Sequence, residues 1–225
     1  MENILNRLSR LAPLTGVVFA ILGAAGFMSG QGPGSTTDGA KIAAFFVANS
    51  TGQQVSDILW ALAFAFLVLF AGSLRSYLRR TPVAEGLSSV VLAGAAMMAV
   101  GAFILFGCDY ALAVGSSHLA PAAAQAVSLI ENKLSFPLAA GGLVFGIASG
   151  LAILRGAQLP KWLGWLALAS GIAMLAAGIF GLFVYFVWTA IASVLVWKRS
   201  GVDTQALRAV SAVTGEQVPA IDGPA

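Results

Sequence analysis

Charged residues are what this sequence has least of. Only 9% of its 225 residues are Asp, Glu, Lys or Arg, whereas 59% are hydrophobic. Soluble domains carry roughly 25% charged residues, because a chain folded in water needs a polar surface. The composition therefore excludes an ordinary soluble globule and is typical of a chain embedded in a lipid bilayer.

Cysteine and histidine are nearly absent as well. The lone Cys108 excludes an internal disulfide and any site that needs several thiolates, and we expect it to pack as a small apolar side chain. His118 is the only histidine, so no histidine pair is available to a haem. The motifs of zinc proteases, serine hydrolases and P-loop proteins are also missing. We therefore expect no catalytic residues, no metal and no cofactor, although an enzyme is not excluded.

Long apolar runs are what the sequence has instead. Six of them approach the ~20 residues that cross a hydrocarbon core about 30 Å thick. None carries an ionisable residue near its centre, which counts against a proton-coupled pump but leaves open a carrier of neutral or lipophilic molecules. The expected spans lie near 13–30, 55–74, 86–107, 135–154, 162–179 and 181–198.

The basic residues are sorted between the gaps that separate these runs. Ten of the twelve Lys and Arg precede the first span, follow the last or lie in every second gap, and only Lys41 and Lys133 lie in the others. Short cytoplasmic loops keep basic residues, so this pattern predicts both termini in the cytoplasm, as six spans also require. Basic residues that flank spans do not form a continuous basic face, and we expect no nucleic-acid partner.

The expected fold is an all-α, polytopic transmembrane helical bundle. Residues 1–12 have one apolar helical face, which predicts an interfacial amphipathic helix. Residues 13–199 form the six-span membrane domain, and residues 200–225 form a cytoplasmic tail. The last two spans leave room only for a very tight turn, which Gly178 and Gly181 allow because they lack a side chain.

The two outer loops each have a segment with helical character. In the first loop, Thr37 or Asp38 can cap a short helix that carries Ile42, Phe45 and Phe46. In the second loop, residues 120–132 can form another. These helices either cover an outer cavity or simply lie at the membrane surface.

The sharpest local pattern is a glycine every four residues in the fourth span. Gly142, Gly146 and Gly150 remove side chains from one helical face, so that another helix can approach closely. We expect this face to pack inside the bundle; packing against a second copy of the chain is the alternative.

Polar side chains suggest two further places for a site. In the sixth span, Tyr185, Trp188, Thr189 and Ser193 share a helical face, where they either line a weakly polar cavity or hydrogen-bond to neighbouring helices. On the outer side, a speculative carboxylate and imidazole site consists of four residues that also have structural explanations as helix-terminal or solvated groups. These four are Asp57, Asp109, His118 and Glu131.

Three phrases carry a family resemblance. LPKWLGWLALASG at 159–171, LRSYLRR at 74–80 and KIAAFFVANS at 41–50 resemble a broad group of uncharacterised six-helix bacterial integral membrane proteins, frequent in actinobacteria and described as domains of unknown function. The resemblance covers most of the chain. It implies a bacterial plasma membrane and brings no established activity or catalytic residue.

Three functional hypotheses follow. The first is a non-enzymatic membrane protein that packs with copies of itself or with another membrane subunit, or that binds a lipid-like ligand. The second is a carrier of a small neutral or lipophilic solute. The third is a membrane enzyme that uses the four outer residues. In all three the lipid bilayer is a partner.

Overall fold

The computed structural model describes residues 11–30, 32–33, 38–115, 117–156 and 158–214. Within these ranges no strand forms, so the expected all-α fold is confirmed. The elements are η1 (Ala12–Leu14), α2 (Thr15–Ser29), α3 (Gly39–Leu78), α4 (Pro82–Gly115), α5 (Pro121–Arg155), α6 (Lys161–Ala177) and α7 (Ile179–Thr214).

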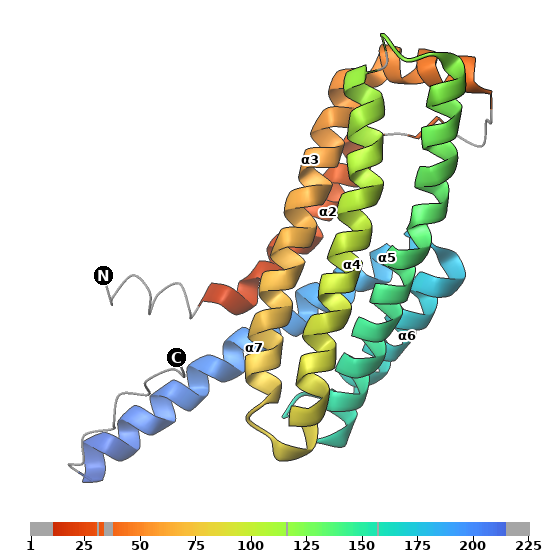
Figure 1. Ribbon diagram of the computed structural model, residues 1–225. Helices are drawn as coiled ribbons and strands as arrows, with labels where there is room; N and C mark the ends of the chain where they lie inside the picture. The colour runs from red at the N-terminus through yellow and green to blue at the C-terminus, as the bar shows by residue number, and fades with distance from the viewer. Residues whose placement is uncertain (1–10, 31, 34–37, 116, 157, 215–225) are drawn as a thin grey trace.

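The helices form a bundle in which each long helix packs against its neighbours along the chain (Figure 1). Contacts between α2 and α7 close the ring, and α3 also touches α5. Small residues let α4 and α5 approach each other closely. A Cβ atom on Gly94 would lie 2.5 Å from the backbone nitrogen of Phe145, and one on Gly101 would lie 2.6 Å from that of Leu138.

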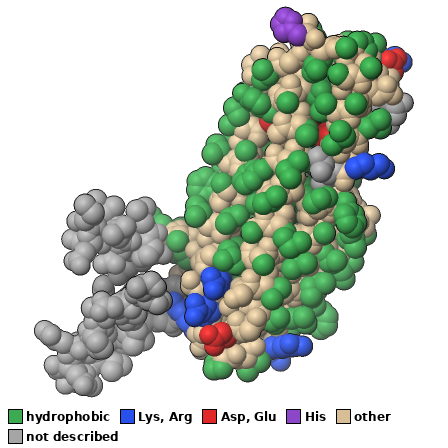
Figure 2. Space-filling view, in the orientation of Figure 1, with side chains coloured by type: hydrophobic (Ala, Val, Ile, Leu, Met, Phe, Trp, Pro, Cys, Tyr) green, Lys and Arg blue, Asp and Glu red, His purple; other side chains and the backbone are tan. Residues whose placement is uncertain are grey.

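Among the described residues, five helical stretches are long and apolar enough to cross a bilayer, by length and composition. Ala12–Ser29, α3, α4, α5 and Phe180–Arg199 meet this condition, whereas α6 is an apolar helix of 17 residues. Large apolar side chains such as Leu69, Met97 and Ile172 are exposed. Figure 2 shows such side chains along most of the visible face, with Lys and Arg at its lower end and also on the right of its upper half. This surface suits a lipid environment.

The two helices expected in loops between the spans are not separate elements. Asp38 is the N-cap of α3, where its Oδ1 accepts a hydrogen bond of 3.0 Å from the Ala40 amide. From there α3 runs without interruption to Leu78. In the same way α5 begins at Pro121 and continues through Pro137.

The first turns of α3 lie across the upper end of the bundle as drawn in Figure 1. Their apolar side chains Ile42 and Phe46 are buried together with Leu112, Ala113 and Ala124, which come from α4 and α5. The apolar face of this segment therefore covers the end of the bundle.

The turn between α6 and α7 is as tight as the sequence predicts. Gly178 has φ 56°, a value that side chains rarely tolerate. A Cβ atom on Gly181 would lie 2.6 Å from the carbonyl oxygen of Ala173. Both glycines are therefore needed where they stand.

Two expected terminal segments lie wholly or partly outside the described residues. Of the interfacial helix over 1–12, only Leu11 and Ala12 are described. The tail that we expect over 200–225 begins as a helix, because α7 continues to Thr214. Residues 215–225 lie outside the described part.

Candidate functional site

Polar side chains are buried near the upper end of the bundle. Gln53 and Asp57 lie one helical turn apart on α3, and their relative exposures are 6% and 3%. Asp109 on α4 is 9% exposed. Residues four apart share a helix face, so α3 presents both side chains toward α4. We refer to Gln53, Asp57 and Asp109 as the polar cluster.

One hydrogen bond holds the polar cluster together. The Gln53 Nε2 atom donates to Asp109 Oδ2 at 3.0 Å. The Gln53 amide also interacts with the Asp57 carboxylate, but neither Asp57 oxygen has a hydrogen bond of normal geometry. Gln53 therefore lies between two carboxyl groups from different helices.

Four acceptor atoms of the polar cluster have no hydrogen-bond partner. They are Gln53 Oε1, both carboxyl oxygens of Asp57 and Asp109 Oδ1. Burial of a polar atom without a partner costs about 1–3 kcal/mol, and more for a charged group. These oxygens are therefore available to a group that brings hydrogen-bond donors or positive charge.

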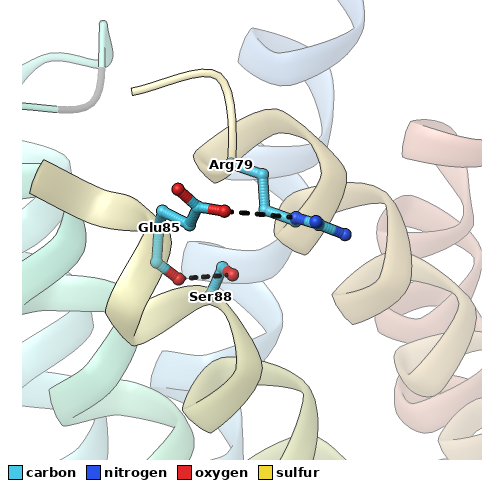
Figure 3. Close-up of polar contacts among 3 residues, drawn as sticks. All are labelled: Arg79, Glu85 and Ser88. Carbon is cyan, nitrogen blue, oxygen red and sulfur yellow. Dashed lines mark hydrogen bonds and ion pairs between the residues drawn. The ribbon is translucent and has the colours of Figure 1, made fainter. Parts of the chain in front are cut away.

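The electrostatic environment of the polar cluster is negative. The charges of Asp109 and Glu131 act on Asp57, and that of Asp109 acts on Glu131. Neither Asp57 nor Asp109 takes part in an ion pair within the described ranges. By contrast, Glu85 at the other end of the bundle lies 4.0 Å from Arg79, and its carbonyl accepts a 2.7 Å hydrogen bond from Ser88 (Figure 3).

Aromatic rings separate the polar cluster from the middle of the bundle. Trp60 lies three residues beyond Asp57, and Phe106 lies three residues before Asp109. Because α3 and α4 are antiparallel, both rings fall on the same side of the cluster. They stack with centroids 4.9 Å apart and planes 5° from parallel. Phe64 and Phe186 pack around Trp60.

A pocket of about 370 Å³ lies beside the polar cluster. Gln53 links the pocket to the polar cluster, because it lines the pocket and donates a hydrogen bond to Asp109. Most of the lining side chains are polar or small, which suits a hydrated ligand better than a lipid chain. The pocket lining consists of Met28, Ser29, Ala48, Asn49, Ser50, Thr51, Gly52 and Gln53.

The structure brings together some of the outer residues singled out in the sequence. Asp57 and Asp109 meet through Gln53, and Glu131 lies within their electrostatic reach. His118 is exposed in the turn after α4. No three His, Cys, Asp or Glu among the described residues are placed to hold a metal ion.

The polar residues of α7 are packed against neighbouring segments. The hydroxyl of Tyr185 donates to the Gly142 carbonyl, and that of Ser193 donates to the Pro13 carbonyl. Trp188 Nε1 donates to the Leu163 carbonyl at 3.1 Å. Thr189 is fully buried, and its hydroxyl has no partner. These four side chains lie in the core of the bundle.

The glycines of α5 face α6 and α7 of the same chain. A Cβ atom on Gly146 would lie 2.6 Å from the Tyr185 hydroxyl oxygen, and one on Gly150 would lie 2.7 Å from the Gly164 carbonyl oxygen. One on Gly142 would lie 2.8 Å from Met174. Packing within the bundle, which we expected for this motif, occupies the glycine face.

Sequence reasoning missed Gln53 and its neighbour Ser56. Ser56 is 3% exposed, and its hydroxyl donates to the Gly26 carbonyl at 2.8 Å, which fastens α2 to α3. The signal was present in the spacing, because residues 53, 56, 57 and 60 share one helical face. An amide one turn before a carboxylate, with an aromatic residue one turn after it, marks this face.

No family model, curated protein or solved structure matches the chain. The function of the site is therefore inferred from its geometry.

Proposed function

We propose that this chain is a six-span protein of a bacterial plasma membrane, with both termini in the cytoplasm and the polar cluster near the outer surface. The five long apolar helices and the exposed apolar side chains support a bilayer location. The sixth span would be α6, whose 17 residues extend about 26 Å at 1.5 Å per residue. The sorting of Lys and Arg supports the orientation.

We further propose that its function is to bind a small polar ligand from the outer side without transforming it. The observation that carries this proposal is the position of Gln53, whose amide lines an outer pocket and holds a buried carboxylate. A few convergent polar groups beside a pocket are the usual arrangement of a small-molecule site. The oxygens of the polar cluster that lack hydrogen-bond partners would attract such a ligand.

The other hypotheses find less support in the geometry. The glycine face of α5 is filled by α6 and α7, so it is not available to a second copy of the chain. Tyr185 and Trp188 are fully buried, where a carrier would need a cavity. The acid–base site would need the His118 imidazole beside the carboxyl groups, but His118 is exposed in the turn after α4.

Cysteine labelling tests both the orientation and the access to the pocket. Ser50 lines the pocket, and Ser76 lies near the basic end of α3. In a Cys108→Ala background, Ser50→Cys should react in intact cells with a maleimide that does not cross membranes. The matched Ser76→Cys variant should react only after the cells are permeabilised. A Ser50→Cys variant that stays unlabelled in intact cells, or equal labelling of both variants, would refute the proposal.

A further inference from the structure

The polar cluster has too many acceptors for its donors. Its one described donor group, the side-chain NH₂ of Gln53, gives one N–H to Asp109 Oδ2, and the second N–H makes no hydrogen bond of normal geometry to Asp57. Gln53 Oε1, both Asp57 oxygens and Asp109 Oδ1 remain without a partner, and the three side chains are at least nine-tenths buried. A ligand that completes this site must bring positive charge or hydrogen-bond donors.

We propose that Gln53, Asp57 and Asp109 bind a small monovalent cation that enters through the neighbouring pocket. This proposal rests on the outward-facing binding function argued above and names the class of its ligand. Carboxylate and amide oxygens are the ligands that hard cations prefer. The same oxygens also fit a small ammonium group, which carries its own N–H donors. The shared chemistry is one positive charge surrounded by oxygen acceptors.

The small number of ligating side chains favours a monovalent cation over Ca²⁺ or Mg²⁺. Ca²⁺ takes six to eight oxygen ligands, and Mg²⁺ demands near-ideal octahedral geometry. Here two carboxyl groups converge through Gln53, while no three acidic, His or Cys side chains within the described ranges are placed to hold a metal. Glu131 adds negative charge to this region, because it interacts electrostatically with Asp57 and Asp109.

The surroundings strengthen the attraction and define the entry. The stacked rings of Trp60 and Phe106 lie between the polar cluster and the middle of the bundle, so a cation would not pass further without displacing them. A charge held above this aromatic layer is poorly screened, and its attraction to the carboxylates is correspondingly large. On the other side, Gln53 opens onto the pocket.

Thermal unfolding of the full chain in mild detergent tests the proposal. The cations used are Na⁺, K⁺ and methylammonium, each replacing N-methylglucamine as chloride salts at constant ionic strength. At least one should raise the unfolding midpoint in a saturable way. Saturation by Na⁺ or K⁺ identifies a metal cation, and saturation by methylammonium alone identifies an amine.

Variants separate the polar cluster from general salt effects. Asp57→Asn keeps the shape of the side chain but removes a carboxylate, and it should weaken the apparent affinity about tenfold or more. Asp109→Asn should also weaken the apparent affinity, and it replaces Asp57→Asn in the test if that variant does not fold. Glu85→Gln removes an exposed carboxylate at the opposite end and should leave the affinity unchanged.

Two results would overturn the cation proposal. One is the absence of a saturable shift with all three cations. The other is an equal shift in wild type, Asp57→Asn and Asp109→Asn. If Ser50→Cys is still labelled from outside, such a result refutes the cation while the outward-facing binding function stands. If Ser50→Cys is not labelled, the binding function itself fails.

Discussion

Gln53 on α3 donates its side-chain N–H to Asp109 on α4 at 3.0 Å, across 56 residues of chain. This bond joins two helices whose other buried contacts are mainly apolar. The Gln53 amide oxygen lies beside Gly30, where a Cβ atom on that glycine would be 3.1 Å away. Both Asp57 oxygens remain without a hydrogen-bond partner.

Loss of the Gln53 amide should destabilise the bundle. Gln53→Leu leaves the buried Asp109 carboxyl without a donor, and a hydrogen bond to a charged group contributes about 1.5–3 kcal/mol. We expect the free energy of unfolding, measured by SDS titration, to fall by about 2 kcal/mol. Gln54→Leu, on the next and less buried position of α3, is the matched control. An equal effect of both substitutions would contradict a specific role for the Gln53 bond.

A methyl group on the packed glycine face of α5 should destabilise the chain. In Gly146→Ala the new Cβ would lie 2.6 Å from the Tyr185 hydroxyl oxygen and 2.7 Å from the Ala167 carbonyl oxygen. Overpacking of this kind costs about 1–3 kcal/mol. In Gly72→Ala the new Cβ meets nothing within 4 Å, so the better helix propensity of Ala should add about 0.5–1 kcal/mol. In the same unfolding assay, Gly146→Ala should lower the free energy of unfolding and Gly72→Ala should raise it. Equal changes in the two variants would argue against close packing at Gly146.

The turn between α6 and α7 should depend on its first glycine. Gly178 has φ 56° and ψ −127°, a conformation that costs a residue with a side chain about 1–3 kcal/mol. Gly178→Ala should therefore lower the unfolding midpoint. Gly107→Ala, at a helical position with nothing within 4 Å of the new atom, should not lower it. A midpoint for Gly178→Ala as high as that of Gly107→Ala would show that the turn adopts another conformation.

Reporter fusions should define the topology. A fusion after Ser117, in the turn between α4 and α5, should be active outside the cell, because this turn lies at the end away from the basic residues. A fusion at Gly215, beyond the described part of α7, should be active inside. An outside signal at Gly215 would change the number of spans and would place α6 on one side of the membrane.

The sequence was sufficient for the class of fold but not for the ends of its helices. Apolar runs of the right length and sorted basic residues predict an all-α bundle whatever the details of packing. Whether a loop helix joins its span is a different question, because it depends on tertiary contacts. Ile42 and Phe46 are apolar in the sequence, yet their burial against Leu112 and Ala124 comes from other helices. This packing keeps α3 continuous from Gly39.

The candidate site was only partly predictable for the same reason. Asp57 and Asp109 were selected because they are acidic residues near span ends, a property visible in the sequence. Gln53 was missed because its role depends on α4 lying beside it. His118 was included because of its chemistry, yet its place in the turn after Gly115 leaves it exposed. Helix pairing decides which polar residues meet, and a single chain does not encode that pairing in any local pattern.

A crystal structure of the full chain grown with Tl⁺ in place of K⁺ would test the account most directly. Thallium scatters anomalously and mimics a monovalent cation of similar size. The account predicts an anomalous peak bounded by Gln53 Oε1, the Asp57 carboxylate and Asp109 Oδ1, and its absence in Asp57→Asn. Crystals that bind Tl⁺ elsewhere but show no peak among these three side chains would contradict it, provided that methylammonium also gives no saturable shift of the unfolding midpoint.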